Sequence, residues 1–194
     1  MNPTCQRRLS HDLRGSVANL RMGLQACIET PSLLTQLGEA LLQEVDRLDR
    51  RLIQLSWMGR CAQPQKQECN LQPVLAAWAQ ERGLPEVECP PLRVSFDPDL
   101  IKAAFFQLCD NAEAHAGGVN QVRVVADDSC WQLQLTDRGA GWPEGLADWL
   151  QDPQLWRGQI ALGLPLVQKV LSCHGGNLLM DRPPASWILP LGVP

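Results

Sequence analysis

The chain has 194 residues, of which 45% are hydrophobic and 20% are charged, and it carries a net charge of -4. These proportions are ordinary for a soluble globular protein of one or two domains, and the negative charge argues against a nucleic-acid binder that neutralises phosphates. No run of about 18 apolar residues occurs, so the sequence predicts neither a membrane span nor a signal peptide. The eight cysteines include no C-x-x-C pair and no zinc spacing, which favours reduced thiols in a cytoplasmic protein.

Apolar residues at helical spacing predict a first amphipathic helix over residues 5–29 and a second over residues 33–59. Pro31 ends the first helix, and Ser32 is expected to cap the second. Such a short turn predicts an antiparallel hairpin. The hairpin either pairs with a second copy as a four-helix bundle in a homodimer or packs on the rest of its own chain. The charged face of the second helix, expected in solvent, consists of Glu39, Glu44, Asp46, Arg47, Asp49, Arg50 and Arg51.

The first helix carries a histidine followed directly by an acid, His11 and Asp12. His11 comes two residues after Leu9 and therefore points away from the apolar stripe. An exposed imidazole beside a carboxylate can act as a nucleophile, because the acid fixes the tautomer and supports the developing charge. Taken alone, such a pair is more often a solvated histidine on a helix face.

Residues 60–70 are polar, aperiodic and contain proline. We therefore expect a helical domain over residues 1–60, a linker over 61–70 and a second domain over 71–194. In the second domain, helix and strand patterns alternate, and Asp97 and Pro98 mark a helix start. The predicted class is α+β, an α/β sandwich with a mixed sheet and helices on one face. Its helices are expected over 71–82, 98–116 and 162–174, and its strands over 93–96, 121–126, 131–136, 178–180 and 187–189.

Three polar or glycine-rich groups in the second domain can carry chemistry. Gln107, Asn111 and His115 are four residues apart and share a helix face, whose amide oxygens suit Mg²⁺, although a wet helix face has the same pattern. The run from Asp137 to Gly141 follows a strand and is either a ligand-binding turn or an ordinary glycine turn. The third group, residues 158–166, leads into a helix N-terminus, where backbone N–H groups suit phosphate.

Together and in this order, the motifs resemble those of a sensor histidine kinase catalytic core. The run Ser10-His11-Asp12-Leu13-Arg14 resembles the H box of a dimerisation and histidine-phosphotransfer domain. Residues 107–115, 137–141 and 161–164 are similar to the N, G1 and G2 boxes of a Bergerat-type ATP-binding domain. His174-Gly175-Gly176 matches the usual end of the helix after the G2 box. The resemblance covers nearly all of the chain.

The resemblance implies an ATP-dependent histidine kinase. His11 would take the γ-phosphoryl group of ATP with Asp12 as the base, and pass it to an aspartate of a response-regulator receiver domain. Asn111 and Gln107 would hold Mg²⁺, and Asp137 would bind the adenine amine. The irregular stretch 141–161 would form a lid. The other nucleotide-binding positions that the resemblance implies are His115, Gly139, Gly141, Leu162, Gly163 and Leu164.

Several positions depart from the family pattern. Gln107 stands where a second Asn is usual, Ala114 where a basic residue is frequent, and Ala161 where the G2 box has a glycine. Gly15 replaces the Thr or Asn that orients water, which predicts weak phosphatase activity, and Ser16 replaces a Pro. These departures keep two alternatives open: a dimeric phosphotransfer adaptor with a degenerate ATP domain, and a non-enzymatic scaffold.

The position of His11 near the start of the sequence bears on regulation. No sensor segment precedes it in the given chain. The sequence therefore predicts either a separate sensory or regulatory partner or a segment cut from a longer chain.

Overall fold

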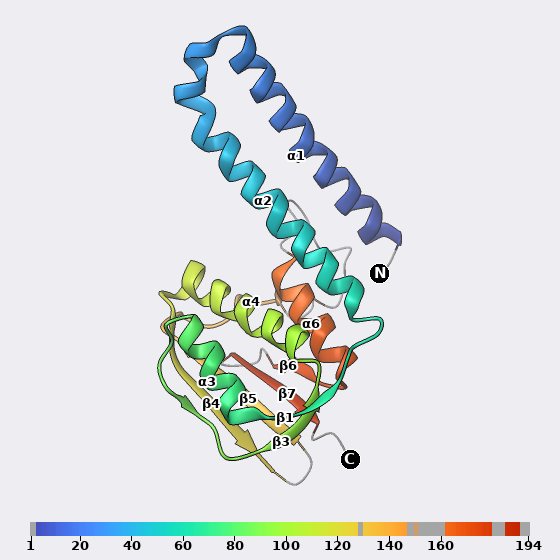
Figure 1. Cartoon of the computed structure of the whole chain (residues 1–194), viewed down its shortest axis with the longest axis vertical. Helices are drawn as coiled ribbons and strands as arrows, with labels where there is room; N and C mark the ends of the chain where they lie inside the picture. The colour runs from blue at the N-terminus through green and yellow to red at the C-terminus, as the bar shows by residue number, and fades with distance from the viewer. Residues whose placement is uncertain (1–2, 128–129, 147–149, 151–161, 180–184, 191–194) are drawn as a thin grey trace. The chain divides into compact units, whose positions relative to one another are not determined.

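The computed structural model describes residues 3–127, 130–146, 150, 162–179 and 185–190 (Figure 1). The chain divides into two compact units. Among the described residues, the first unit holds the chain up to Ser56 together with Leu162, and the second holds Trp57–Leu150 and the chain from Gly163 onward. Part of the expected lid, together with Ala161 and Met180, lies outside the described residues. No helix in the described part of the chain is long and apolar enough to cross a membrane.

The first unit is an antiparallel helical hairpin, as the sequence predicted (Figure 1). Helix α1 (Pro3–Glu29) is followed by the 3-10 turn η1 (Pro31–Leu33) and helix α2 (Leu34–Arg60). Ser32 lies inside η1, so its prediction as the cap of the second helix was wrong. Thr30 precedes the turn without a capping hydrogen bond from its side chain, and Pro31 starts the turn, because its fixed φ suits the first position of a helical turn.

The two helices of the hairpin contact each other through side chains, but they bury few apolar residues between them. A Cβ built at Gly23 would lie 2.5 Å from Leu41 Cδ2, so the glycine leaves room for the leucine of the facing helix. Among the described apolar side chains up to Ser56, only Cys27 is buried. A hairpin of this length with so small a core is not a self-sufficient folding unit.

Arg51 corrects a second expectation. The sequence placed it on the solvent face of α2, but its side chain is buried, with 8% of its surface exposed. It comes three residues after Leu48 and four before Leu55, so it belongs to the inward stripe of the helix. The error arose because the residue was assigned by its charge and not by its helical spacing.

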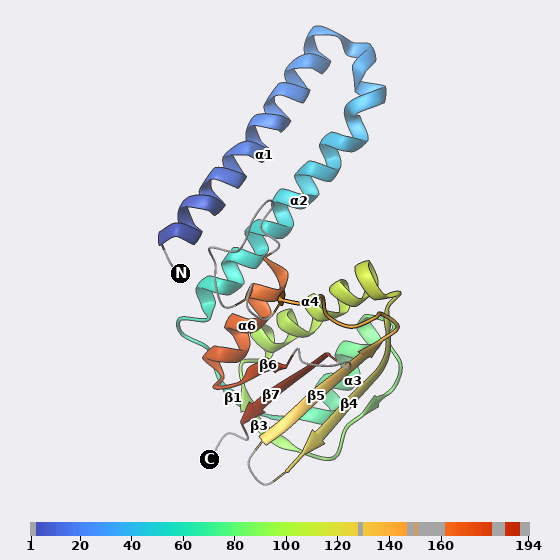
Figure 2. The ribbon, with the colours of Figure 1, turned by 180° about the vertical axis from the view of Figure 1, so that it is seen from behind.

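The second unit is an α/β sandwich with a mixed sheet, which confirms the predicted class. The five-stranded sheet has the order β2-β4-β5-β7-β6; β2 and β4 pair in parallel and the other neighbours are antiparallel. Figures 1 and 2 show the helices on one face of this sheet. The elements are β1 (Gln67–Asn70), α3 (Leu71–Glu81), β2 (Val87–Glu88), β3 (Arg93–Phe96), α4 (Pro98–Ala116), β4 (Val119–Ala126), β5 (Cys130–Asp137), α6 (Gly163–Cys173), β6 (Asn177–Leu179) and β7 (Ala185–Pro190).

The core of the second unit lies between the sheet and its helices. Alternate residues of β5 are buried, which is the period-2 pattern of a strand with one covered face. Trp131 on β5 stacks near Phe96 on β3, with ring centroids 6.3 Å apart. Trp78 on α3 contacts Phe96 edge-on and also contacts Phe105 on α4, so aromatic rings join α3, α4, β3 and β5.

Part of the predicted linker is structured. Gln67–Asn70 forms β1 and pairs antiparallel with β3 in a separate two-stranded sheet. Its residues are mostly exposed and do not alternate, so its backbone pairing left no periodic signal in the sequence.

Candidate functional site

His11 lies exposed on the first helix of the hairpin. Its side chain is 88% exposed on α1, as its helical spacing predicted. Its Nδ1 lies 3.5 Å from Asp12 Oδ1, and the Asp12 side chain is 24% exposed. The imidazole is therefore open at Nε2 while a carboxylate faces its other ring nitrogen, an arrangement that suits a nucleophile supported by a base.

A buried polar pair that joins the two helices of the hairpin was not foreseen. Arg51 Nη1 on α2 donates a long hydrogen bond of 3.4 Å to Ser16 Oγ on α1, and Ser16 is 7% exposed. Ser16 follows Asp12 by four residues, so the two share a helix face. Helical spacing could have identified this pair, because Ser16 lies between Leu13 and Leu20 at intervals of three and four.

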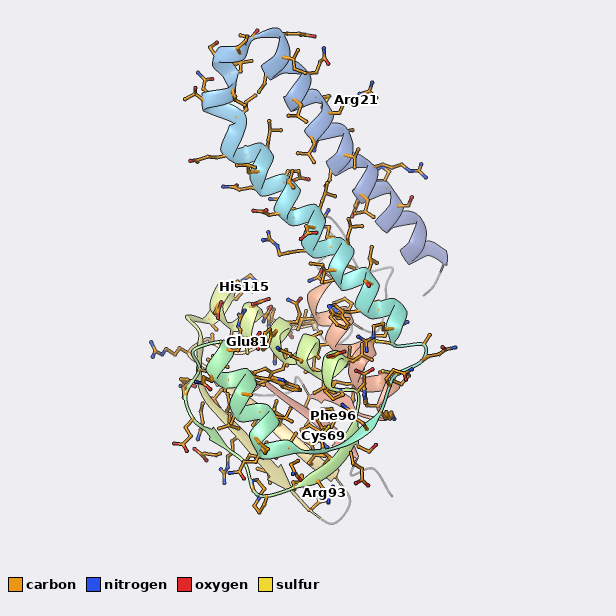
Figure 3. All side chains as sticks on the ribbon, in the orientation of Figure 1. Arg21, Cys69, Glu81, Arg93, Phe96 and His115 are labelled. Carbon is orange, nitrogen blue, oxygen red and sulfur yellow. The ribbon has the colours of Figure 1, made fainter. Side chains whose placement is uncertain are left out.

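In the second unit, helix α4 carries the first predicted group of site residues. Its start is well defined: the Asp97 side chain accepts hydrogen bonds from the backbone N–H groups of Asp99 and Leu100, as a predicted N-cap should. Gln107 and Asn111 are half-buried, and His115 is exposed in the last turn of the helix (Figure 3). One face of α4 thus runs from partly covered amides to an exposed imidazole.

The turn after β5 brings the second predicted group to the end of α4. The backbone N–H of Arg138 donates to the Ala116 carbonyl, 3.2 Å away. A Cβ built at Gly139 would lie 2.7 Å from Ala116 Cβ, so only glycine allows this approach. Asp137 Oδ1 accepts a hydrogen bond of 2.8 Å from the Gly139 N–H, which fixes its carboxylate in the turn. Gly141 has a φ of 92°, a conformation that glycine adopts without strain.

The third group meets the same helix from the other side. A Cβ built at Gly163, the first residue of α6, would lie 2.7 Å from Gln107 Nε2. The side chain of Gln107 therefore packs directly over the N-terminal turn of α6. Leu162 is buried, and Leu164 is half-buried and packs against the core of the second unit.

All three groups predicted in the second domain thus border α4. The G2-like turn contacts Gln107, the G1-like turn contacts Ala116, and Asn111 lies between these two points along the helix. His11 belongs to the other unit.

The carboxylates next to Asn111 have partners. Arg82 pairs with both Asp110 and Glu113 on α4. The described residues contain no group of three or more His, Cys, Asp or Glu that could hold a metal ion. A cation at this site would therefore depend on amide oxygens, on oxygens of a bound ligand and on water. Mg²⁺ takes oxygen ligands and keeps several waters, so such a set can hold it.

A buried polar cluster between the start of α4 and the end of α6 was also not predicted from the sequence. His174 at the end of α6 is 5% exposed, and its Nε2 accepts a hydrogen bond of 3.0 Å from the Asp97 N–H. Its Nδ1 lies 2.7 Å from the Val170 carbonyl and so carries the proton. Arg60 and the Gln65 N–H both bind the Asp97 carboxylate. This network joins the start of α4 to the end of α6.

Comparison with known proteins supports the fold. No protein-family model and no curated protein matches the chain. Among solved structures, Acinetobacter baumannii histidine kinase AdeS superposes with a TM-score of 0.71 at 18% identity, covering 94% of this chain and 98% of that one. The fold is therefore that of a histidine kinase catalytic core.

Two further structures give the same result. Histidine kinase ThkA, solved in complex with response regulator protein TrrA, matches with a TM-score of 0.71 at 18% identity over 97% of this chain, which spans 61% of that one. The ATP binding domain of PrrB from Mycobacterium tuberculosis matches 67% of this chain, and 98% of its own length is covered, with a TM-score of 0.52 at 24% identity.

Proposed function

We propose that this chain is an ATP-dependent histidine kinase of two-component signalling, which phosphorylates itself on His11. The observation that carries the proposal is the meeting of three motifs, distant in the sequence, along α4 in a fold shared with histidine kinases. A non-enzymatic scaffold requires neither this arrangement nor an exposed His11-Asp12 pair, whereas a histidine kinase requires both.

The nucleotide would bind along α4 in the second unit. Asp137 is held by the Gly139 N–H and has carboxylate capacity left to accept a hydrogen bond from the adenine amine. The N-terminal turn of α6 offers backbone N–H groups to phosphate oxygens. The full set of nucleotide-binding residues that we propose is Asn111, His115, Asp137, Gly139, Gly141, Leu162, Gly163 and Leu164.

The residues of α4 fit the cation that ATP requires. Asn111 is half-buried with an amide side chain, and Gln107 places a second amide beside the start of α6. We propose that these two residues hold Mg²⁺, which would neutralise charge on the phosphates. The paired carboxylates of Asp110 and Glu113 leave this role to the amides.

The transfer step uses His11 and Asp12. The lone pair of His11 Nε2 attacks the γ-phosphorus of ATP, a P–N bond forms, the bond to the β,γ-bridging oxygen breaks, and ADP leaves. The Nδ1 proton passes to Asp12, so the phosphorylated imidazole is left neutral. In this loose transfer, the residues contribute mainly positioning and charge stabilisation.

The hairpin supports a homodimer. Nine of the ten large hydrophobic side chains exposed among the described residues lie on α1 and α2, with Val125 as the exception. Such a surface is too apolar for a monomer in water, and two hairpins could cover each other as a four-helix bundle. The nine residues are Val17, Met22, Leu24, Ile28, Leu34, Leu42, Val45, Leu52 and Ile53.

The phosphoryl group on His11 needs an acceptor. ThkA is a histidine kinase solved together with a response regulator, and this chain shares its fold. We therefore propose a receiver-domain aspartate of a response regulator as the acceptor, and a separate sensory or regulatory protein as the source of the signal.

Incubation with γ-labelled ATP and Mg²⁺ tests the proposal. We expect acid-labile label on the wild type, and none on His11→Gln or Asn111→Ala. Asn120→Ala, at an exposed position of β4, is the matched control and should label normally. If the wild type takes no label from ATP but accepts it from a phosphorylated receiver, the chain is a phosphotransfer adaptor. If it takes label from neither, it is a non-enzymatic interaction protein.

A further inference from the structure

Asp12, Ser16 and Arg51 place polar groups in the interior of the hairpin. Ser16 and Arg51 are both more than nine-tenths buried. Asp12 Oδ2 is a buried oxygen with no hydrogen-bond partner among the described residues. Burying a guanidinium and a carboxylate oxygen is costly unless they are paired, so a cluster of this kind needs an explanation.

Helix geometry places the two charged groups within reach of each other. Asp12 and Ser16 lie one turn apart on the same face of α1, where Cβ atoms are about 5–6 Å apart. Arg51 Nη1 already contacts Ser16 Oγ from the facing helix. A guanidinium has five N–H donors in a rigid fork and can bridge two acceptors at this separation.

We infer that Arg51 is a positioning residue for the phosphorylation of His11. Its guanidinium contacts Ser16 in this structure, and a small shift of this side chain would let it bind the unpartnered inward oxygen of Asp12 and so aim the outward oxygen at His11 Nδ1. The effect on phosphorylation rests on the proposed function. The arrangement of Arg51, Asp12 and His11 does not depend on it. Asp12 Oδ1 faces His11 while Oδ2 is the buried atom, so the carboxylate has one oxygen for each partner.

The effect on His11 follows from the tautomer. A carboxylate held against Nδ1 keeps the proton on that nitrogen and leaves the Nε2 lone pair free for attack. Without Arg51, the Asp12 side chain can rotate toward water, and the imidazole loses its fixed tautomer and its base. Arg51 is thus expected to act through Asp12 and to leave nucleotide binding in the other unit unchanged.

The competing explanation is that Arg51 and Ser16 only set the register of the two helices, as buried polar groups do in coiled coils. The two explanations differ in what they predict for His11. A register role predicts a change in stability without a change in the histidine tautomer, whereas a positioning role predicts the change in tautomer in a folded chain.

The first measurement is independent of kinase activity. Nitrogen-15 spectra of the histidine side chains, assigned with His11→Gln, report the tautomer of His11 above pH 8 in the full chain. We expect the Nδ1–H form in the wild type and its loss in Arg51→Leu, Arg51→Met and Asp12→Asn. Arg50→Leu, a neighbouring exposed arginine, is the matched control and should keep the wild-type spectrum. Retention of the wild-type tautomer in both folded Arg51 variants would overturn the inference.

The second measurement is a double-mutant cycle on autophosphorylation. We expect Arg51→Leu to lower the rate by about tenfold, with the KM for ATP unchanged. This is less than the roughly 10²- to 10⁴-fold effect of a general base itself, because Arg51 acts only through Asp12. The double variant with Asp12→Asn should be no slower than Asp12→Asn alone, because Arg51 acts through that residue. If the rate reductions of the two single variants multiply in the double variant, the inference is contradicted. If the wild type is not labelled at all, the kinase proposal fails, and the tautomer measurement alone decides the role of Arg51.

Discussion

The side chain of Gln107 fills the space that a Cβ would occupy at Gly163, with Nε2 2.7 Å from that position. This contact joins the N-box-like helix to the start of α6. The clashing atoms are at the end of a flexible side chain. Gly163→Ala should therefore leave the free energy of unfolding almost unchanged but displace the Gln107 amide. Through the loss of about one hydrogen bond or metal contact, we expect ATP affinity to fall roughly three- to tenfold.

Isothermal titration with ATP and Mg²⁺ measures this effect. In a Gln107→Ala background the space is empty, so Gly163→Ala should change the affinity no further. An equal loss in both backgrounds would show that Gly163 acts through something other than Gln107.

Gly139 is under a stricter constraint than Gly163. Its missing Cβ would lie 2.7 Å from Ala116 Cβ. An alanine Cβ is fixed by the backbone and cannot rotate aside. We expect Gly139→Ala to lower the free energy of unfolding of the second unit by about 1–3 kcal/mol, the usual cost of overpacking.

Chemical denaturation checks the Gly139 prediction. Gly59, near the end of α2, has no atom within 4 Å of its Cβ position and serves as the control. Gly59→Ala should leave stability unchanged or raise it, because alanine favours the helix. Equal destabilisation by the two substitutions would contradict the steric account.

The exposed apolar residues of the hairpin predict dimerisation. Leu42 is 66% exposed on α2, and Val125 is 42% exposed on β4 of the second unit. A lysine at Leu42 would have to be desolvated in a two-hairpin bundle, so Leu42→Lys should raise the dimer dissociation constant at least about tenfold. Val125→Lys should leave it unchanged. Sedimentation equilibrium over a range of concentrations measures both, and a wild type that stays monomeric throughout would refute the bundle.

His174 gives the second unit a dependence on pH. Burial lowers the pKa of its imidazole, and the nearby Lys66 adds to the shift while the Val170 carbonyl and Asp97 oppose it. In the unfolded chain the pKa is about 6.5. Below that pH the unfolded chain binds a proton that the native protein does not. Stability is therefore full above about pH 6.5 and falls as the pH drops, by at most about 1.4 kcal/mol per pH unit.

Tryptophan fluorescence is a suitable probe for the His174 prediction, because no tryptophan precedes residue 57 and both Trp78 and Trp131 are buried. Denaturation curves at pH 7.5 and 5.5 should differ in the wild type and differ less in His174→Gln. The same pH dependence in both proteins would contradict a role for His174.

The sequence predicted best where the signals were local. The bounds of α4 and β3 and the cap at Asp97 are confirmed, because a proline, a capping side chain and helical spacing all act within a few residues. Two short strands were missed. Strand β2 has two residues, and β1 is polar and exposed, so both depend on pairing partners far along the chain.

In the candidate site, too, features set by local spacing were predicted, and features that depend on distant partners were not. The exposure of His11 and the shared face of Gln107 and Asn111 followed from helical periodicity. The burial of Arg51 did not, because this residue was assigned to solvent by its charge, and no prediction was made for the burial of His174. Their partners, Ser16 and Asp97, come from other elements and become neighbours only in the folded chain.

The central claim is that the γ-phosphoryl group of ATP is transferred to Nε2 of His11. Phosphorus-31 NMR of the chain after incubation with ATP and Mg²⁺ tests it most directly, because phosphohistidine isomers, phosphoserine and acyl phosphates resonate apart. We predict one Nε2-phosphohistidine signal in the wild type, lost on acid treatment and absent from His11→Gln. A signal that persists in His11→Gln, or a wild type with no phosphohistidine, would contradict the account.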